Sequence, residues 1–167
     1  LIEGLPAGAA EQHPETWIDA VRHVCSELVM QVDASRVAGL GISGQQHGFV
    51  PLDDDGAVIR PAKLWCDTAT SVEAEELSRM YGRSVPTGFT ASKILWLKRH
   101  EPENWSRLRT ILLPHDYVNF RLTDTFTMEA GDASGTGFFD SASRMFDLHE
   151  VSAIDPRVCD MLPELVG

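Results

Sequence analysis

Residues 88–100 read GFTASKILWLKRH, and this stretch decides the fold class of the chain. Ile94, Leu95, Trp96 and Leu97 give it apolar faces, which is typical of a helix packed on at least one side. We therefore expect a helix over residues 91–100. Further elements follow on both sides, and they alternate between helical and extended patterns.

On the carboxyl side the sequence predicts one short helix, one strand, one longer helix and one loop. The short helix is expected from Pro102 onward and the strand over residues 110–113. The longer helix is expected over residues 115–122 and the loop over residues 131–137. On the amino side, residues 71–81 predict a helix whose acidic first half suits the helix dipole.

Earlier in the chain, Trp17, Val21, Val24 and Leu28 recur at helical spacing after Pro14. Residues 36–42 are rich in small and branched apolar residues and predict a buried strand that ends at a tight turn. Residues 48–60 predict a hairpin with an acidic turn. The mixture is α/β, and 167 residues are one domain's worth.

Composition narrows the function classes. The formal net charge of −11 disfavours binding to nucleic acid and to anionic membranes. The 43% of hydrophobic residues suffices for a core, but no apolar run is long enough to predict a membrane-spanning helix. Three distant cysteines, Cys25, Cys66 and Cys159, have no metal spacing and favour reduced thiols in a cytoplasmic protein.

Two motifs fail, and a third stays open between two interpretations. Residues 41–45 resemble a serine nucleophile elbow, but Gln45 stands where that turn needs glycine. Residues 53–56 are acidic, yet Ala57 and Val58 occupy positions that a calcium loop would need. Residues 131–137 are rich in small residues and suit either a phosphate or a structural turn, but lack the Lys-Ser/Thr ending of a Walker loop.

Two polar segments are more informative. Gln45, Gln46 and His47 follow the predicted strand, and they offer the donors and acceptors needed to bind sugar hydroxyls. Trp65 offers an indole face for a sugar, and Asp67 can accept from two hydroxyls. A plain polar turn and a core tryptophan beside a helix N-cap explain the same residues, so both interpretations stay open here.

Taken together, these segments resemble the FGGY family of carbohydrate kinases. Residues 88–100 match its N-terminal signature at every defining position, and residues 41–48 resemble the Gly-Ile-Ser-Gly-Gln-Met-His-Gly segment of its xylulokinase members, with Gln46 in place of methionine. Residues 113–117 and 132–136 also match, with His115 where lysine is common, and His13 departs from an early Glu-Gln-Asp-Pro segment. The resemblance covers nearly the whole chain.

The resemblance implies most of the N-terminal domain, actin-like and ribonuclease-H-like, of a two-domain sugar kinase. It implies ATP-dependent phosphorylation of a small-molecule sugar, D-xylulose to D-xylulose 5-phosphate, with Mg²⁺. Gln46, His47 and Trp65 would contact the sugar, with Asp67 a weaker candidate. Lys93 and Trp96 would organise the signature helix and loop rather than take part in chemistry.

Two departures limit what these residues would do alone. Nothing matches the family's first strand with its Asp-X-Gly-Thr phosphate loop, and the catalytic aspartate is expected after Gly167. We therefore expect an incomplete domain, inactive by itself, with core surface exposed around the missing strand. A kinase of ribulose, sedoheptulose, gluconate or glycerol, a non-catalytic sugar-binding module and a plain structural domain are the alternatives, and homodimer formation stays open.

Overall fold

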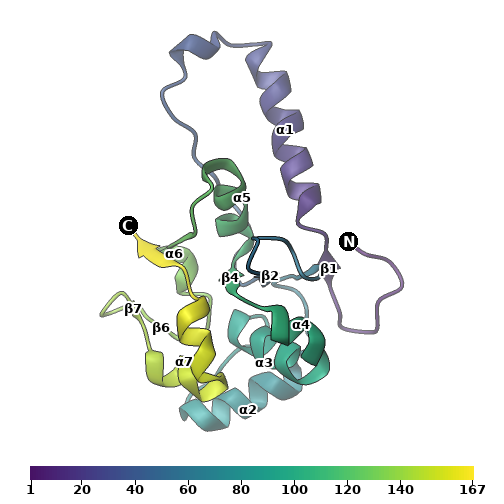
Figure 1. Cartoon of the computed structure of the whole chain (residues 1–167), viewed down its shortest axis with the longest axis vertical. Helices are drawn as coiled ribbons and strands as arrows, with labels where there is room; N and C mark the ends of the chain where they lie inside the picture. Colours follow the sequence, from purple (N-terminus) through teal and green to yellow (C-terminus); the bar gives the residue numbers. More distant parts are fainter.

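The computed structural model describes residues 1–167 as a packed body with one projecting arm (Figure 1). The α-helices are α1 Glu15–Val29, α2 Ser71–Tyr81, α3 Thr90–His100, α4 Pro102–Arg107, α5 Pro114–Thr123, α6 Ala130–Ala133 and α7 Leu148–Ile154. The 3-10 helices are η1 Ala34–Arg36 and η2 Pro156–Met161. The strands are β1 Glu11–Gln12, β2 Val50–Leu52, β3 Ala62–Lys63, β4 Thr110–Leu112, β5 Thr127–Glu129, β6 Phe139–Asp140, β7 Met145–Phe146 and β8 Glu164–Val166.

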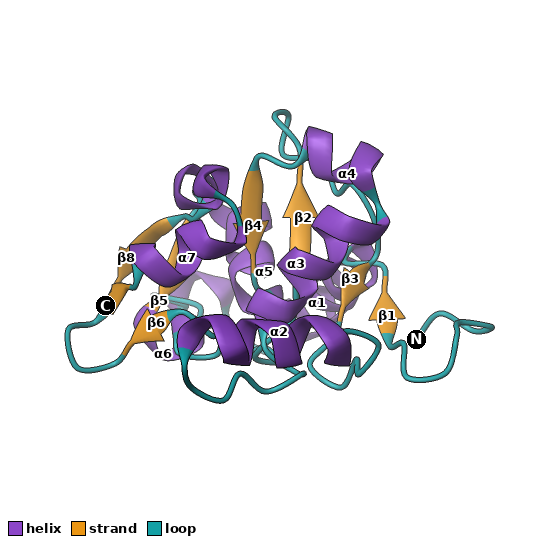
Figure 2. Ribbon diagram, turned by 90° about the horizontal axis from the view of Figure 1, so that it is seen from below, coloured by secondary structure: helices purple, strands orange, loops and turns teal.

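The centre of the body is the antiparallel pair of β2 and β4, which stand side by side in Figure 2. Side chains of a strand alternate between its two faces, and here both faces are covered. Ile111 belongs to the larger core cluster, which also includes apolar side chains of α3 and α7. Leu112 joins a second cluster with Ile18 of α1 and Tyr117 of α5. The elements around the pair therefore form layers on each side of it.

The remaining strands pair in three short ladders: β1 with β3 and β6 with β7 antiparallel, and β5 with β8 parallel. The expected α/β mixture is confirmed. The expected hairpin is partly formed: residues 53–56 make the acidic turn, and a bridge joins Leu52 to Val58. No helix of the chain has both the length and the apolar character that crossing a membrane would need.

The signature helix α3 contributes more buried residues than any other helix of the chain. Its side chains from Thr90 to Leu95 and Leu97 are all buried. The predicted helices α2, α3 and α5 and the predicted strand β4 lie within a residue or two of their expected bounds. Gly82 ends α2 in the left-handed conformation that glycine adopts without strain (φ 67°).

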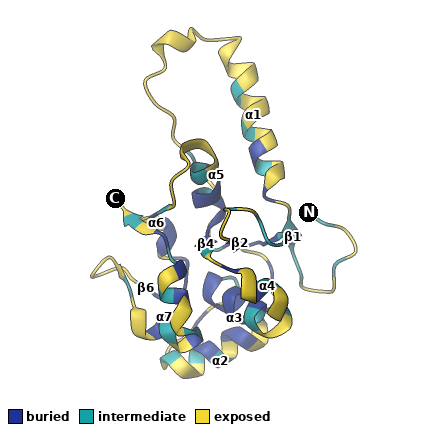
Figure 3. Cartoon of the chain, viewed as in Figure 1, coloured by how far each residue is buried: buried dark blue, intermediate teal, exposed yellow.

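The projecting arm consists of α1, η1 and the return segment up to residue 45, and Figure 3 shows it largely exposed. Ile18 is the one buried residue of α1. The strand predicted over residues 36–42 does not form: apart from Arg36, which ends η1, this segment has no regular structure, and Val37 and Leu40 are exposed. A strand forms only when it pairs with a neighbouring strand, and none of the paired strands of this chain includes residues 36–42.

Candidate functional site

The site centres on His47, whose backbone lies in the left-handed region (φ 62°). This conformation is strained for a residue with a side chain and persists only where its surroundings impose it. The imidazole stacks on the ring of Phe89, with centroids 4.5 Å apart and planes 18° apart. Nδ1 lies 3.1 Å from the carbonyl oxygen of Gly135.

That hydrogen bond fixes the tautomer of His47. A carbonyl oxygen can only accept, so Nδ1–H of His47 must donate to Gly135. In the neutral ring Nε2 then carries a lone pair. His47 is partly exposed, so this nitrogen is available as an acceptor for a hydroxyl group.

Gly135 is a requirement of the site that sequence reasoning missed. A Cβ atom at this position would overlap the imidazole ring of His47, so any side chain would displace that ring. The sequence signal was present: residues 131–137 are rich in small residues, which we interpreted only as a turn or a phosphate loop. The stacking partner Phe89 lies in the signature itself and was also missed.

The first turn of α3 holds the two sides of the site together. The hydroxyl of Thr90 donates to the carbonyl oxygen of Gly48 at 3.0 Å, and the N–H of Ala91 donates to that of Thr136 at 2.7 Å. Lys93 donates to the carbonyl oxygens of Gly88 and Phe89. Burial lowers the pKa of Lys93 to about 7. The signature thus positions loops and keeps its lysine away from solvent.

Trp65 and His47 lie at the same end of one antiparallel contact. An antiparallel β-bridge joins Phe49 to Lys63. His47 lies two residues before Phe49 and Trp65 lies two residues after Lys63, so both follow the bridge at the same end. The Trp65 side chain is large, apolar and 56% exposed. Gly88 packs closely against the backbone of Trp65, because a Cβ at Gly88 would lie 2.8 Å from the Trp65 carbonyl oxygen.

Gln46 precedes His47 and is exposed, with no hydrogen bond to another residue. Three of the predicted site residues, Gln46, His47 and Trp65, thus lie at least partly exposed near the same end of the Phe49–Lys63 bridge. An amide, an imidazole acceptor and an exposed indole face form the kind of set that binds a polyhydroxylated ligand.

Asp67 is placed differently. It is fully buried, and its Oδ2 accepts from the ammonium of Lys63 at 3.1 Å and from the N–H of Ala10 at 2.9 Å. Lys63 also pairs with Glu11 and lies 4.0 Å from the centroid of the Trp96 ring. The carboxylate of Asp67 is occupied by protein groups and supports the turn that carries Trp65.

The loop over residues 131–137 offers little to a phosphate. Four of its N–H groups already donate within the protein, those of Ser134, Gly135 and Thr136 to backbone carbonyls and that of Asp132 to the Glu129 carboxylate. A phosphate cradle needs such groups free. The structural interpretation of this loop is the better one.

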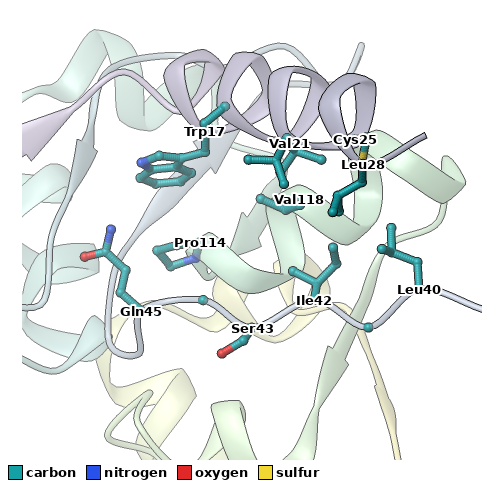
Figure 4. Close-up of a pocket in the computed structure, with 14 residues that line it drawn as sticks. Trp17, Val21, Cys25, Leu28, Leu40, Ile42, Ser43, Gln45, Pro114 and Val118 are labelled. Atoms are coloured by element: carbon teal, nitrogen blue, oxygen red, sulfur yellow. The ribbon is translucent and has the colours of Figure 1, made fainter. Parts of the chain in front are cut away.

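A separate groove of 460 Å³ runs between α1 and the segment at residues 40–45 (Figure 4). Its walls are mainly apolar, including Val21, Leu28, Leu40, Ile42 and Val118. A sugar has a hydroxyl on nearly every carbon and needs convergent polar groups, which this groove does not supply. Its apolar walls set it apart from the polar surface around His47.

Comparisons with known proteins agree with this geometry. The family model described as "FGGY family of carbohydrate kinases, N-terminal domain" matches residues 3–167. The chain is 37% identical to the xylulose kinase of Haemophilus influenzae over 96% of its length, and 40% identical to that of Escherichia coli over 91%. It superposes on the crystal structure of xylulose kinase from Rhodospirillum rubrum with a TM-score of 0.88, 28% identity and 99% coverage.

These relatives are much longer proteins. The chain spans 36% and 32% of the two relatives compared by sequence and 37% of the crystallised one, about a third in each case. The expected fold, that of a sugar-kinase N-terminal domain, is confirmed by the superposition.

Proposed function

Because this chain belongs to the FGGY family of carbohydrate kinases, we propose that it is the sugar-binding part of an ATP-dependent kinase that converts D-xylulose to D-xylulose 5-phosphate. The relatives bearing the name xylulose kinase support D-xylulose over other ketoses and polyols. The observation that carries the proposal is the strained, stacked and hydrogen-bonded placement of His47 beside exposed Gln46 and Trp65.

Each of the three side chains has a distinct part in this proposal. Nε2 of His47 accepts a hydrogen bond from one sugar hydroxyl, and the amide of Gln46 exchanges hydrogen bonds with neighbouring hydroxyls. Trp65 packs against the C–H groups of the sugar. The hydrogen bond from Nδ1–H to Gly135 fixes the direction of the ring, so we assign His47 the role of orienting the substrate rather than that of the base.

The nucleotide belongs elsewhere in the protein. ATP with Mg²⁺ would supply the transferred phosphoryl group and neutralise its charge. The one candidate phosphate loop of this chain suits the nucleotide poorly, because four of its N–H groups are engaged within the protein. Asp67 is also unavailable, since its carboxylate is paired with Lys63. The contribution of this chain is to bind and orient the sugar.

The same proposal fixes the setting in which the protein works. We expect the kinase in the cytoplasm, because it consumes ATP there and because its charged, phosphorylated product cannot leave the cell. The partner is a small-molecule sugar, and the net charge of −11 disfavours nucleic acid. Homodimer formation stays a prediction, which the molecular mass of the protein in solution would test.

The test is steady-state kinetics of the complete protein with His47→Ala. Loss of one hydrogen bond to a sugar hydroxyl, about 1–2 kcal/mol, should raise KM for D-xylulose about 10-fold and change kcat less. KM for ATP should stay the same and serves as the control. An unchanged KM for D-xylulose would remove His47 from the site, and a panel with ribulose and glycerol would reveal another substrate.

A further inference from the structure

Three metal-ligand side chains meet beneath the loop that carries Gly135. His115 and Asp116 lie on the first turn of α5, and Asp132 lies in α6. Nδ1 of His115 is 3.3 Å from Oδ1 of Asp116 and 3.3 Å from Oδ2 of Asp132. All three ligand atoms lie within 4.8 Å of one another. The proposed sugar site uses none of these side chains.

The cluster is buried and carries unmatched negative charge. Asp116 is 1% exposed and Asp132 is 9% exposed, and Oδ2 of Asp132 has no hydrogen-bond partner although it is shielded from solvent. Such an atom is expensive to bury and calls for a donor or a cation. Glu129 adds a third carboxylate nearby, while His115 supplies at most one positive charge.

We propose that His115, Asp116 and Asp132 bind a divalent transition-metal ion of the Zn²⁺ class. Zinc takes nitrogen from histidine and oxygen from aspartate at about 2.0–2.1 Å in a tetrahedral arrangement, in which neighbouring ligand atoms lie about 3.3 Å apart. Both distances from Nδ1 of His115 match that separation. An ion between the three atoms would also supply the missing partner of Asp132.

The surroundings already orient two of the ligands. Oδ2 of Asp116 accepts from the N–H of Leu113 at 3.0 Å, which leaves Oδ1 for the ion. Asn119 places its amide 3.3 Å from Nε2 of His115. With Nδ1 on the metal, Nε2 carries the proton, and rotation of the amide lets the Asn119 oxygen accept it. Second-shell hydrogen bonds of this kind usually fix a metal-bound histidine.

A bound ion would fasten the start of α5 to α6. The loop after α6 leads directly to Gly135, whose carbonyl holds His47. The ion would therefore stabilise the loop whose Gly135 carbonyl oxygen holds His47 in place. The proposal does not depend on which sugar is bound or on catalysis, because every contact in it lies within this chain.

Isothermal titration of the chain with Zn²⁺ tests the site. Asp132→Asn should remove one binding event per chain, while the exposed matched variant Asp140→Asn should keep it. Zn²⁺ should also raise the Tm of the unmodified chain and of Asp140→Asn, but not of Asp132→Asn, because a ligand stabilises only a state that binds it.

His115→Lys provides a second, independent variant. Its ammonium would pair with both carboxylates without a metal, so this variant should fold and should also lack the binding event. Equal Zn²⁺ uptake by the unmodified chain and by either folded variant would overturn the proposal. The exposed histidines and cysteines would then hold the metal, and the cluster would share a proton on Nδ1 instead.

Discussion

The arm and the body of this molecule have equally well-formed sequence patterns and opposite outcomes. α1 carries apolar residues at helical spacing, as a packed helix does, yet Val24, Leu28 and Val29 are about half exposed. In α3 every side chain from Thr90 to Leu95 is buried. A hydrophobic pattern states which face will be buried if a partner is there, and only the three-dimensional structure states whether it is.

The largest expected difference between the regions concerns charge. Asp67→Ala would leave Lys63 buried with one partner fewer and should lower the free energy of unfolding by about 3–5 kcal/mol. The matched change in the arm, Asp19→Ala, removes an exposed carboxylate and should change it by about 0.5 kcal/mol or less. Urea denaturation of both variants measures this. A stable Asp67→Ala protein with weaker sugar binding would instead place Asp67 in the site.

A pair of leucine substitutions tests the same contrast for apolar side chains. Leu97→Ala empties space in a fully buried position of α3 and should cost about 2–5 kcal/mol. Leu28→Ala removes a side chain that is 49% exposed in α1 and should cost less than about 1 kcal/mol. The midpoints of urea unfolding give both values. Equal losses would mean that the arm is packed in solution.

Two glycines extend the comparison from stability to the site. Gly135→Ala should push the His47 ring aside and raise KM for D-xylulose in the complete protein about 10-fold, as loss of the same hydrogen bond would. Gly39→Ala in the arm meets nothing within 4 Å and should leave KM unchanged. If Gly135→Ala binds sugar normally, the placement of His47 does not control binding.

The smallest expected effect is a pH dependence that only the body should show. Burial lowers the pKa of Lys93 to about 7, below its value in the unfolded chain, so unfolding takes up a proton between these two values. Stability should therefore rise as pH increases above about 7, by up to about 1 kcal/mol between pH 7 and 8. Below pH 7 this contribution becomes constant, because both states are protonated.

Lys93→Met removes the titrating group, so comparison of its pH profile with that of the unmodified chain isolates the effect. Urea unfolding at closely spaced pH values provides the measurement. Identical slopes in the two proteins would mean that Lys93 stays protonated while buried.

Local signals predicted much of the body. Pro102 begins a helix as the sequence predicted, and the helix expected over residues 115–122 begins one residue earlier, at Pro114. The strand expected at residues 36–42 failed because strand formation depends on a neighbour that local sequence does not reveal. Residue type likewise could not predict that Trp65 is exposed and that Asp67, two residues later, is buried.

The candidate site was predictable in its polar residues and not in its supports. Side-chain type alone left a polar turn and a core tryptophan open for Gln46, His47 and Trp65, and the family resemblance selected them as candidates. Gly135 and Phe89 act through shape, and they lie 88 and 42 residues from His47 in the sequence, so no local pattern connects them. The positive φ of His47 is also a tertiary effect, since a histidine seldom adopts it unaided.

The parallel pairing of β5 with β8 gives the synthesis of this protein an order. β5 leads directly into α6 and the loop carrying Gly135, but its partner strand lies after β6, β7 and α7 in the chain. A ribosome therefore completes His47, Phe89 and Gly135 well before it delivers the strand that holds β5 in place. All residues of the candidate site therefore precede, in the chain, the strand at residues 164–166 that pairs with β5, so the β5–β8 ladder closes only after those residues have been translated.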